Sequence, residues 1–338
     1  MKRNYGLDLF RIFLCLCVVI LHSLNYYGIE NTYCTAIISG FLVQANGAFY
    51  LLSGYFNLEK EFNDSTDIKE YYKKKIIYVL FPFVAFLFVL TIWDYLHVNN
   101  RFNIIEILQN FYDTVMSSAC DGHLWFLYPL FGLLLSTPFI SKALHNMNEK
   151  ELKILWYVAI GWNFVSYYLC WNLGVNFKFS SWFLDGWPIF YFAGYYYRHV
   201  IAKESKLKWI ILGILGFVIT NTGYLFYDSF TGAFDIQPMF TIFCVSCLMF
   251  WDKAFNISNE KIGKVILFIS KNTFLIYLLH MHAIEYVVRK LDIVEASFIN
   301  GSLVVAGSFI LALIASTIVN TIMKPMQKGI DKVWIIKQ

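Results

Sequence analysis

The chain has 338 residues, of which 58% are hydrophobic and only 15% are charged. A soluble globular domain is closer to half apolar and a quarter charged, so this composition excludes an ordinary soluble protein and indicates one that lies in a lipid bilayer. The small net charge of +4 gives no strongly basic surface, and we expect no nucleic-acid partner.

Ten apolar segments follow one another along the chain, each near the length of about 20 residues that a helix needs to cross a bilayer. We therefore expect an all-α, polytopic bundle of about ten transmembrane helices, forming a single membrane-embedded domain over residues 1–338. This makes the chain a multi-pass protein of a cell membrane, such as a bacterial plasma membrane. The predicted spans are approximately 7–27, 34–57, 76–96, 123–141, 153–171, 182–198, 208–227, 237–251, 262–282 and 298–323.

The Lys and Arg residues are unevenly distributed between the connections of these spans. Most of the 27 fall in the connections that are cytoplasmic if the N-terminus is cytoplasmic, and only a handful fall on the other side. Positive residues are retained on the cytoplasmic side of membrane proteins. The sequence therefore predicts that both termini are cytoplasmic.

The first span contains a cation and an imidazole, Arg11 and His22. On an α-helix the two positions differ by only about 20° in direction and lie about 16 Å apart along the axis. A charge facing lipid is costly, so we expect this stripe to face the bundle interior or a watery cavity. The alternatives are that Arg11 extends to the inner interface, paired with Asp8, and that His22 is a hydrogen-bonded interfacial residue.

The second and third spans contain two further motifs. The run "GAFYLLSGYF" ends in Ser53, Gly54 and an aromatic residue, and Ser-Gly is typical of close helix packing or of a distorted helix beside a ligand. The run "KKKIIYVLFPF" joins a basic cluster to a proline, and its cations are Lys73, Lys74 and Lys75. Beyond the third span, residues 103–115 predict an amphipathic helix at the membrane interface.

The fourth span begins with "GHLWFLYPLF", which includes His123 and Trp125. Asp121 would cap this helix and place His123 in its first turn, where the helix dipole favours a neutral imidazole. A neutral imidazole can accept a proton from a hydroxyl group. The alternative is that His123 and Trp125 only hold the helix at the membrane interface, where aromatic residues are common.

The ninth span contains "SKNTFLIYLLHMH", in which Tyr277 and His280 share one helix face. With His22 and His123, His280 falls in the predicted outer half of the membrane, where Asp185 supplies a carboxylate to orient an imidazole or contact an acceptor. Lys271 lies near the inner end of the same span. It either lines a donor entrance or extends its ammonium group to the interface.

Taken together, these motifs resemble the membrane acyltransferase-3 family, which O-acylates surface polysaccharides and other acceptors. The Arg11-to-His22 spacing, the Ser53-Gly54 run, the basic cluster leading to Pro82, the His-Leu-Trp-Phe-Leu stretch and the Tyr-Leu-x-His helix appear in family order. Two features depart from the family pattern. The basic cluster has lysines and Tyr78 where the family has arginines and a second basic residue. We also expect no C-terminal extracytoplasmic esterase-like domain of the kind that some family members carry, so transfer would be completed in the membrane domain or with a separate partner.

The resemblance implies an O-acyltransferase, by default an O-acetyltransferase, that takes its acyl group from cytoplasmic acetyl-CoA or another acyl-CoA. The acceptor would be a hydroxyl of a surface or lipid-linked glycan. We expect no metal and no other cofactor. The implied catalytic residues are His22, Arg11 and His123. The implied acyl-CoA site comprises Arg11, Lys73, Lys74, Lys75, Ser53, Gly54 and Lys271, and the implied acceptor site comprises Trp125, Tyr277, His280 and Asp185.

Two other functions fit the same composition. A polysaccharide transporter, flippase or polymerase would also be helical, rich in aromatic residues and basic on its inner side. A proton-coupled carrier could use Arg11 and His22 as gating residues. Only the acyltransferase should release free thiol from acyl-CoA when a glycan acceptor is present.

Overall fold

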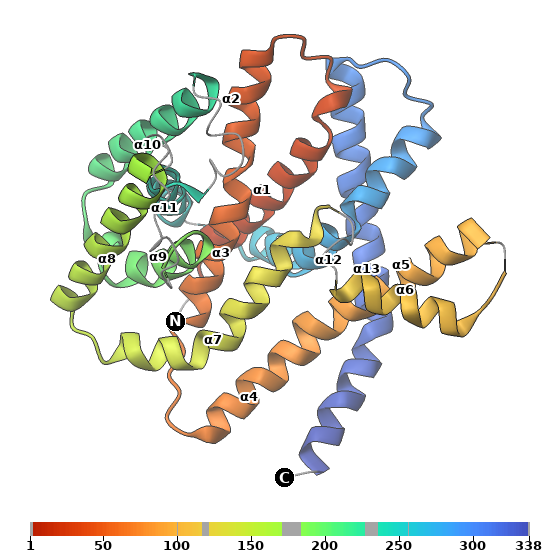
Figure 1. Cartoon of the computed structure of the whole chain (residues 1–338), viewed down its shortest axis with the longest axis horizontal. Helices are drawn as coiled ribbons and strands as arrows, with labels where there is room; N and C mark the ends of the chain where they lie inside the picture. Colours follow the sequence, from red (N-terminus) through yellow and green to blue (C-terminus); the bar gives the residue numbers. More distant parts are fainter. Residues whose placement is uncertain are drawn as a thin grey trace. The chain divides into compact units, whose positions relative to one another are not determined.

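The computed structural model describes residues 3–99, 101–116, 122–170, 184–226, 236–255 and 257–336. Within these ranges the secondary structure is entirely helical (Figure 1). The chain divides into two compact units, one formed by Met1–Glu61 and Thr137–Leu313 and the other by Phe62–Ser136 and Ile314–Gln338. The predicted all-α fold is confirmed, whereas the single functional domain stays a prediction.

The first unit is built from eight complete helices in its described part. These are α1 (Tyr5–His22), α2 (Thr32–Leu42), α3 (Gln44–Asn57), α8 (Glu149–Phe164), α9 (Trp187–His199), α10 (Lys206–Phe226), α11 (Pro238–Ala254) and α12 (Glu260–Lys290). The second unit contains α4 (Ser65–Lys75), α5 (Phe81–Asn99) and α6 (Ile104–Met116). Helices α7 (Leu127–His145) and α13 (Phe298–Ile336) each contribute residues to both units.

Asparagine side chains define where several helices begin. Asn4, Asn31, Asn148 and Asn259 each accept hydrogen bonds from the first backbone N–H groups of α1, α2, α8 and α12. These N–H groups have no partner within the helix, so a capping side chain fixes the helix start. At the other end of α1, the N–H of Ser23 bonds to the carbonyl of Ile20, and a 3-10 turn follows. The first helix therefore ends at His22 rather than at residue 27.

A π-helical turn, Ile76–Leu80, separates α4 from α5. Pro82 stands at the second position of α5, where it has no N–H to donate and its ring would clash with a carbonyl one turn earlier. Widening the preceding turn relieves this clash, and π-turns are typical of such points. The proline of the "KKKIIYVLFPF" motif thus produces a local change in helix geometry.

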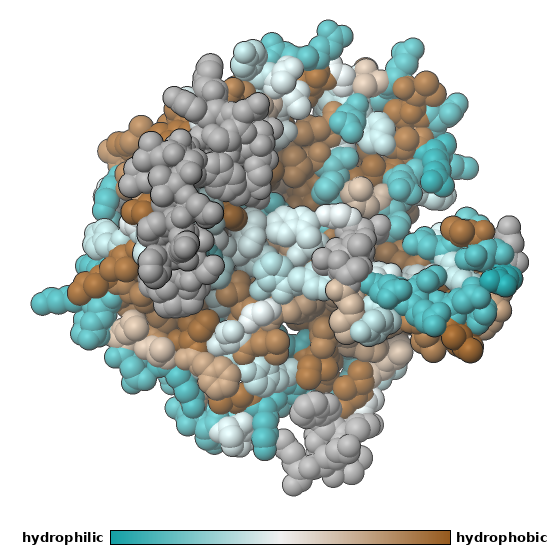
Figure 2. Space-filling model, viewed as in Figure 1, coloured by the Kyte–Doolittle hydropathy of each residue, from teal (hydrophilic) through white to brown (hydrophobic). Residues whose placement is uncertain are grey.

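Seven helical segments in the described ranges are long and apolar enough to cross a membrane. They are Tyr5–His22, Thr32–Asn57, Ser65–Asn99, Leu124–His145, Lys206–Gly223, Glu260–Lys290 and Phe298–Asp331. The other three predicted spans correspond to the shorter helices α8, α9 and α11. Large apolar side chains are widely exposed on the surface (Figure 2). The chain is a helical membrane bundle, and ten crossings with cytoplasmic termini stay a prediction.

Candidate functional site

Helix α1 holds both residues of the predicted Arg11–His22 stripe. It runs without a break from Tyr5 to His22, so the predicted spacing along one helix is confirmed. Its buried residues include Phe10, Leu14 and Val19, and α12 packs along it. Arg11 and His22 are each half-buried. The packing of α1 against α12 therefore determines what surrounds His22.

The guanidinium group of Arg11 lies over the ring of Phe56 from α3, 5.4 Å from the ring centre. The alternative of a direct pairing with Asp8 is not what the geometry shows, because no ion pair joins the two side chains. The carboxylate of Asp8 accepts hydrogen bonds from Arg3 Nε at 2.7 Å and from Ser270 Oγ on α12 at 2.9 Å. Among the described residues no carboxylate lies within ion-pair distance of the Arg11 guanidinium, and Asp8 acts on it only across a longer distance.

The imidazole of His22 meets a second imidazole, that of His280 on α12, with 5.1 Å between the ring centres. His280 is fully buried, and its Nδ1 lies 2.6 Å from the carbonyl oxygen of Tyr277. A carbonyl oxygen only accepts hydrogen bonds, so Nδ1 carries the proton, and a neutral ring then presents Nε2 as an acceptor. The ring of Tyr277 lies 5.8 Å from that of His280, which confirms the shared helix face.

Ser53 and Gly54 lie on α3 at its contact with α9. A side-chain carbon at Gly54 would collide with the backbone carbonyl of Tyr191, so glycine is required by the close approach of the two helices. The Ser53 carbonyl accepts a hydrogen bond from the Asn57 side chain at 2.8 Å. This geometry accounts for Gly54 through packing, and a contact with acyl-CoA stays a prediction.

Two other predicted residues of the first unit lie in different settings. Lys271 is exposed on α12, as the alternative of an ammonium group extending to the interface requires. Asp185 is half-buried just before α9, with its carboxylate beside Tyr167 and the backbone of Gly186. Gly186 has a positive φ of 65°, which sets the turn into α9. Roles in the donor and acceptor sites stay predictions for both residues.

The predicted basic cluster belongs to the second unit, at the end of α4. Lys73 pairs with Asp331 at 2.6 Å and with Glu70 at 3.8 Å, and Lys74 pairs with Glu70 at 3.2 Å. The ammonium group of Lys75 lies over the ring of Tyr71 at 5.2 Å. Phosphate binding by these lysines stays a prediction. To bind a phosphate, Lys73 and Lys74 would have to release the carboxylates with which they now pair.

His123 and Trp125 also belong to the second unit. His123 is buried directly before the 3-10 turn Leu124–Phe126, which leads into α7, so it precedes the first turn that the sequence predicts for it. Trp125 is partly exposed and its ring meets that of Phe126. Asp121, the expected cap, lies outside the described residues. Catalytic and acceptor-binding roles for His123 and Trp125 stay predictions.

A polar network near the end of α3 was not predicted. Glu59 accepts from His199 at 2.8 Å and pairs with Arg198 at 3.2 Å, and Arg198 lies over the ring of Tyr55 at 5.1 Å. Phe56, which contacts Arg11, is the neighbour of Tyr55. The quoted motif "GAFYLLSGYF" contains both aromatic residues, but nothing in its sequence indicates which cations they meet.

The first unit can therefore support proton transfer beside a bound anion. A paired imidazole stands at one end of α1, and an arginine that makes no direct ion pair in the described chain stands nearer the other end. Imidazole is the side chain best suited to remove a proton from a hydroxyl at neutral pH. Among the described residues no group of three or more His, Cys, Asp or Glu side chains is placed to hold a metal ion.

Comparison with known proteins identifies the family. A curated protein of Enterococcus faecalis, named "Amino-acid racemase", is 24% identical over 344 residues, which cover 92% of this chain and 45% of that protein. The chain therefore spans less than half the length of this relative. No solved structure matches. The family model described as "Acyltransferase domain" matches residues 4–321, nearly the whole chain. The chain thus belongs to the acyltransferase-3 family of membrane acyltransferases.

Proposed function

We propose that the chain transfers an acyl group, by default acetyl, from cytoplasmic acyl-CoA to a hydroxyl of a surface or lipid-linked glycan. The observation that carries this proposal is the placement of Arg11 and His22 on α1, with His22 beside the buried His280 of α12. Membership of the acyltransferase-3 family supports the reaction class. The proposed location is a bacterial plasma membrane, which offers acyl-CoA on one side and glycan on the other.

In the proposed reaction His22 acts as the general base. It removes the proton from the acceptor hydroxyl while the hydroxyl oxygen attacks the thioester carbon. The carbon–sulfur bond then breaks, the coenzyme A thiolate leaves and takes up the proton, and the acyl group remains on the glycan as an ester. His280 positions the ring of His22, and its own Nδ1 is held by the Tyr277 carbonyl. In this proposal the two imidazoles work together in removing the proton.

The donor is proposed to bind with its phosphates toward Arg11. Guanidinium groups bind phosphate through paired, charge-assisted hydrogen bonds, and in the described chain Arg11 makes no direct ion pair that would occupy its N–H groups. The rise from Arg11 to His22, about 16 Å, suits the length of the pantetheine arm. In this proposal Lys73, Lys74, Lys75 and Lys271 attract the donor electrostatically, and Ser53 and Gly54 line its path.

The acceptor is proposed to approach His22 from the outer side. His280 and Tyr277 border this position on α12. Trp125 would stack on a sugar ring, and Asp185 would accept hydrogen bonds from sugar hydroxyls. In the same proposal His123 is a second imidazole for the transfer.

The proposal is tested by incubating purified protein with acetyl-CoA and a glycan fraction from host cells. Free thiol and alkali-labile acetate on the glycan are measured together. We expect both products from the native chain, only a trace of either from His22→Ala, and a raised KM for acetyl-CoA with little change in kcat from Arg11→Ala. His97→Ala, which removes a histidine whose ring lies 4.5 Å from that of Trp93, is the matched control and should behave as the native chain does. Unchanged turnover in His22→Ala would contradict the proposed base.

A further inference from the structure

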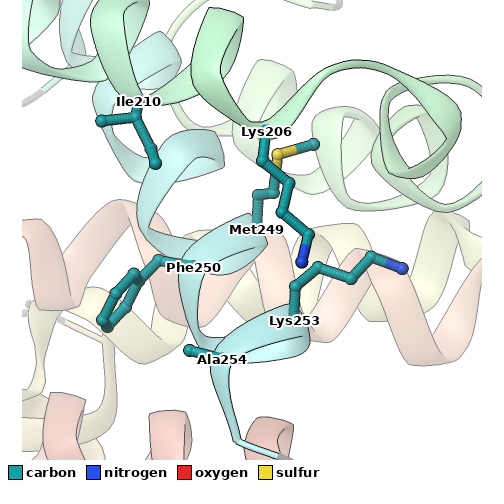
Figure 3. A pocket seen from close by; sticks show the side chains of 6 residues that line it. All are labelled: Lys206, Ile210, Met249, Phe250, Lys253 and Ala254. Carbon is teal, nitrogen blue, oxygen red and sulfur yellow. The ribbon is translucent and has the colours of Figure 1, made fainter.

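A pocket of about 90 Å³ lies between the start of α10 and the end of α11 (Figure 3). It is lined by Lys206 and Ile210 of α10 and by Met249, Phe250, Lys253 and Ala254 of α11. A water molecule needs about 10–15 Å³ of such volume, so the pocket accommodates several atoms of a ligand but not a large molecule. A ligand that fills it must therefore extend beyond it.

The two lysines give one side of the pocket a positive charge. Figure 3 shows their side chains extending from neighbouring helices toward the same side. Lys206 is the first residue of α10, where the helix N-terminus adds a partial positive charge, and it has no ion pair in the described chain. Lys253 forms an ion pair with Asp252 at 3.3 Å, and the same carboxylate also accepts hydrogen bonds from Tyr197 and Asn4. Both lysines are exposed, so an anion can reach either ammonium group, and at Lys253 it would share the cation with Asp252.

The rest of the pocket is apolar and opens on the surface of the helices. The side chain of Phe250 is 52% exposed and that of Ile210 is 42% exposed, and α10 continues with further exposed apolar residues such as Ile214. In a membrane bundle such a surface faces the acyl chains. The lysines stand where the apolar run of α10 begins, which is the level of the lipid headgroups.

We infer that this pocket binds one anionic phospholipid, with its phosphate between Lys206 and Lys253 and one acyl chain along Ile210 and Phe250. Charge complementarity selects an anionic headgroup, and the exposed apolar lining selects a lipid over a free phosphate. The site is separate from the Arg11–His22 stripe, and its existence does not depend on the reaction that the protein catalyses.

The test uses a photoactivatable phosphatidylglycerol that carries a diazirine in its acyl chain, added to the full chain reconstituted in phosphatidylcholine vesicles. After illumination, labelled peptides are identified by mass spectrometry. We expect labelling of α10 and α11 near Ile210 and Phe250. The double change Lys206→Gln with Lys253→Gln should lower the labelling about thirtyfold. Each lysine near a membrane surface strengthens the binding of an anionic lipid by about fivefold, and the two factors multiply.

Two controls make the result specific. Lys261→Gln with Lys264→Gln removes the same charge from the exposed start of α12 and should leave the labelling unchanged. Lys206→Arg with Lys253→Arg should keep it, which separates lost charge from lost folding. The inference is overturned if the same lipid with a phosphocholine headgroup labels the pocket equally, if the glutamine variant is labelled as strongly as the native chain, or if an excess of inorganic phosphate abolishes the labelling.

Discussion

The residue that most constrains the function is Arg11. A cation inside an apolar helix is costly unless it has a partner or faces a watery cavity. Here the guanidinium lies over the ring of Phe56, while Asp8 is bound to Arg3 and Ser270 and acts on Arg11 only across a longer distance. Contact with an aromatic ring stabilises a guanidinium by only about 0.5–2 kcal/mol. A site that leaves this guanidinium without a direct ion pair is suited to an anionic ligand such as a nucleotide phosphate.

The pair His22 and His280 should lose activity non-additively. We expect His22→Ala to leave only a trace of thiol release, measurable at high protein concentration, and His280→Ala to lower kcat by about ten- to a hundredfold, because the remaining base would be poorly positioned. The double variant should be no worse than His22→Ala alone, since residues that act as a unit share one contribution. The measurement is kcat for acetyl-CoA in the four proteins. Independent, multiplying losses would show that the two imidazoles do not act together.

At the scale of elements, sequence patterns predicted where helices form better than they predicted which side chains from other helices contact them. The apolar run and the spacing of Arg11 and His22 were sufficient to place both on one helix, and that helix forms. The partners of Asp8 and His22 were not predictable, because Ser270 and His280 lie more than 250 residues away in the chain and only tertiary packing brings them together. The predicted helix lengths were wrong where a cap or turn ends the helix. The first helix, for example, ends before Ser23 and not at residue 27.

The α3–α9 contact should be sensitive to a single added methyl group. Gly54→Ala would place a carbon against the Tyr191 carbonyl, and because that atom is backbone, the helices must separate. Overpacking of this kind costs about 1–3 kcal/mol, so the midpoint of thermal unfolding in detergent should fall by several degrees. Gly161→Ala on α8 meets no atom within 4 Å and is the matched control. Equal midpoints for the two variants would show that α3 and α9 are not in close contact.

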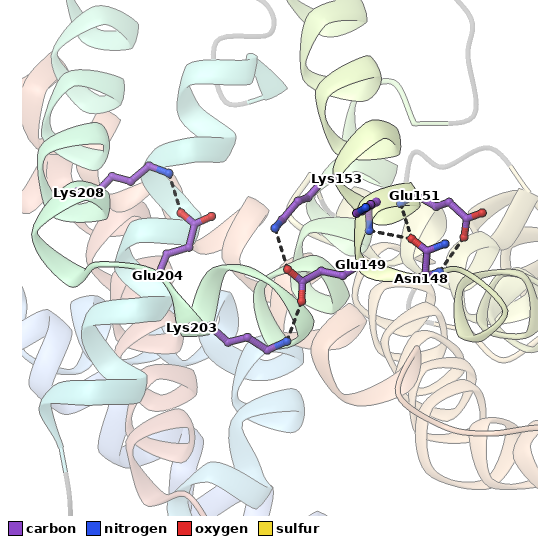
Figure 4. A network of polar contacts seen from close by, with 8 residues as sticks. Asn148, Glu149, Glu151, Lys153, Lys203, Glu204 and Lys208 are labelled. Carbon is purple, nitrogen blue, oxygen red and sulfur yellow. Dashed lines mark hydrogen bonds and ion pairs between the residues drawn. The ribbon is translucent and has the colours of Figure 1, made fainter.

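The start of α8 contains an ion network that depends on pH (Figure 4). Glu149 accepts from Lys153 at 2.7 Å and from Lys203 at 3.1 Å, and these hydrogen bonds lower the pKa of its carboxyl to about 2. Its folded pKa lies below the ordinary value of 4.5, so the stabilisation is present above about pH 4.5 and is lost as the pH falls toward 2. Because the network is exposed, the effect should be small and weakened by salt.

The measurement compares the unfolding midpoints of the native chain and Glu149→Gln at pH 6.5 and pH 3. The native chain should be the more stable at pH 6.5, and the difference should shrink at pH 3. Glu61→Gln, which removes an exposed carboxylate that has no ion pair in the described chain, should show no such trend. A difference that stays constant with pH would mean that the Glu149 carboxylate contributes through packing instead of charge.

At the scale of the whole molecule, the apolar segments predict ten crossings, and the distribution of Lys and Arg predicts cytoplasmic termini. Cys34 is exposed at the start of α2 and is predicted to lie outside, whereas Ser205, before α10, is predicted to lie inside. A membrane-impermeant maleimide should therefore label Cys34 in intact cells. In Ser205→Cys it should label position 205 only after the membrane is permeabilised. Labelling of position 205 in intact cells would reverse the predicted orientation.

The central claim is that Arg11 and His22 serve one acyl-CoA site along α1. Its most direct test is an experimental structure of the protein with an unreactive acetyl-CoA analogue in which the thioester sulfur is replaced by a methylene group. We predict density that runs from the Arg11 guanidinium to the His22–His280 pair, with the acyl carbonyl within about 4 Å of His22, close to the distance from which a reaction proceeds. An analogue bound away from α1, or an Arg11 and His22 that face lipid in that structure, would contradict the account.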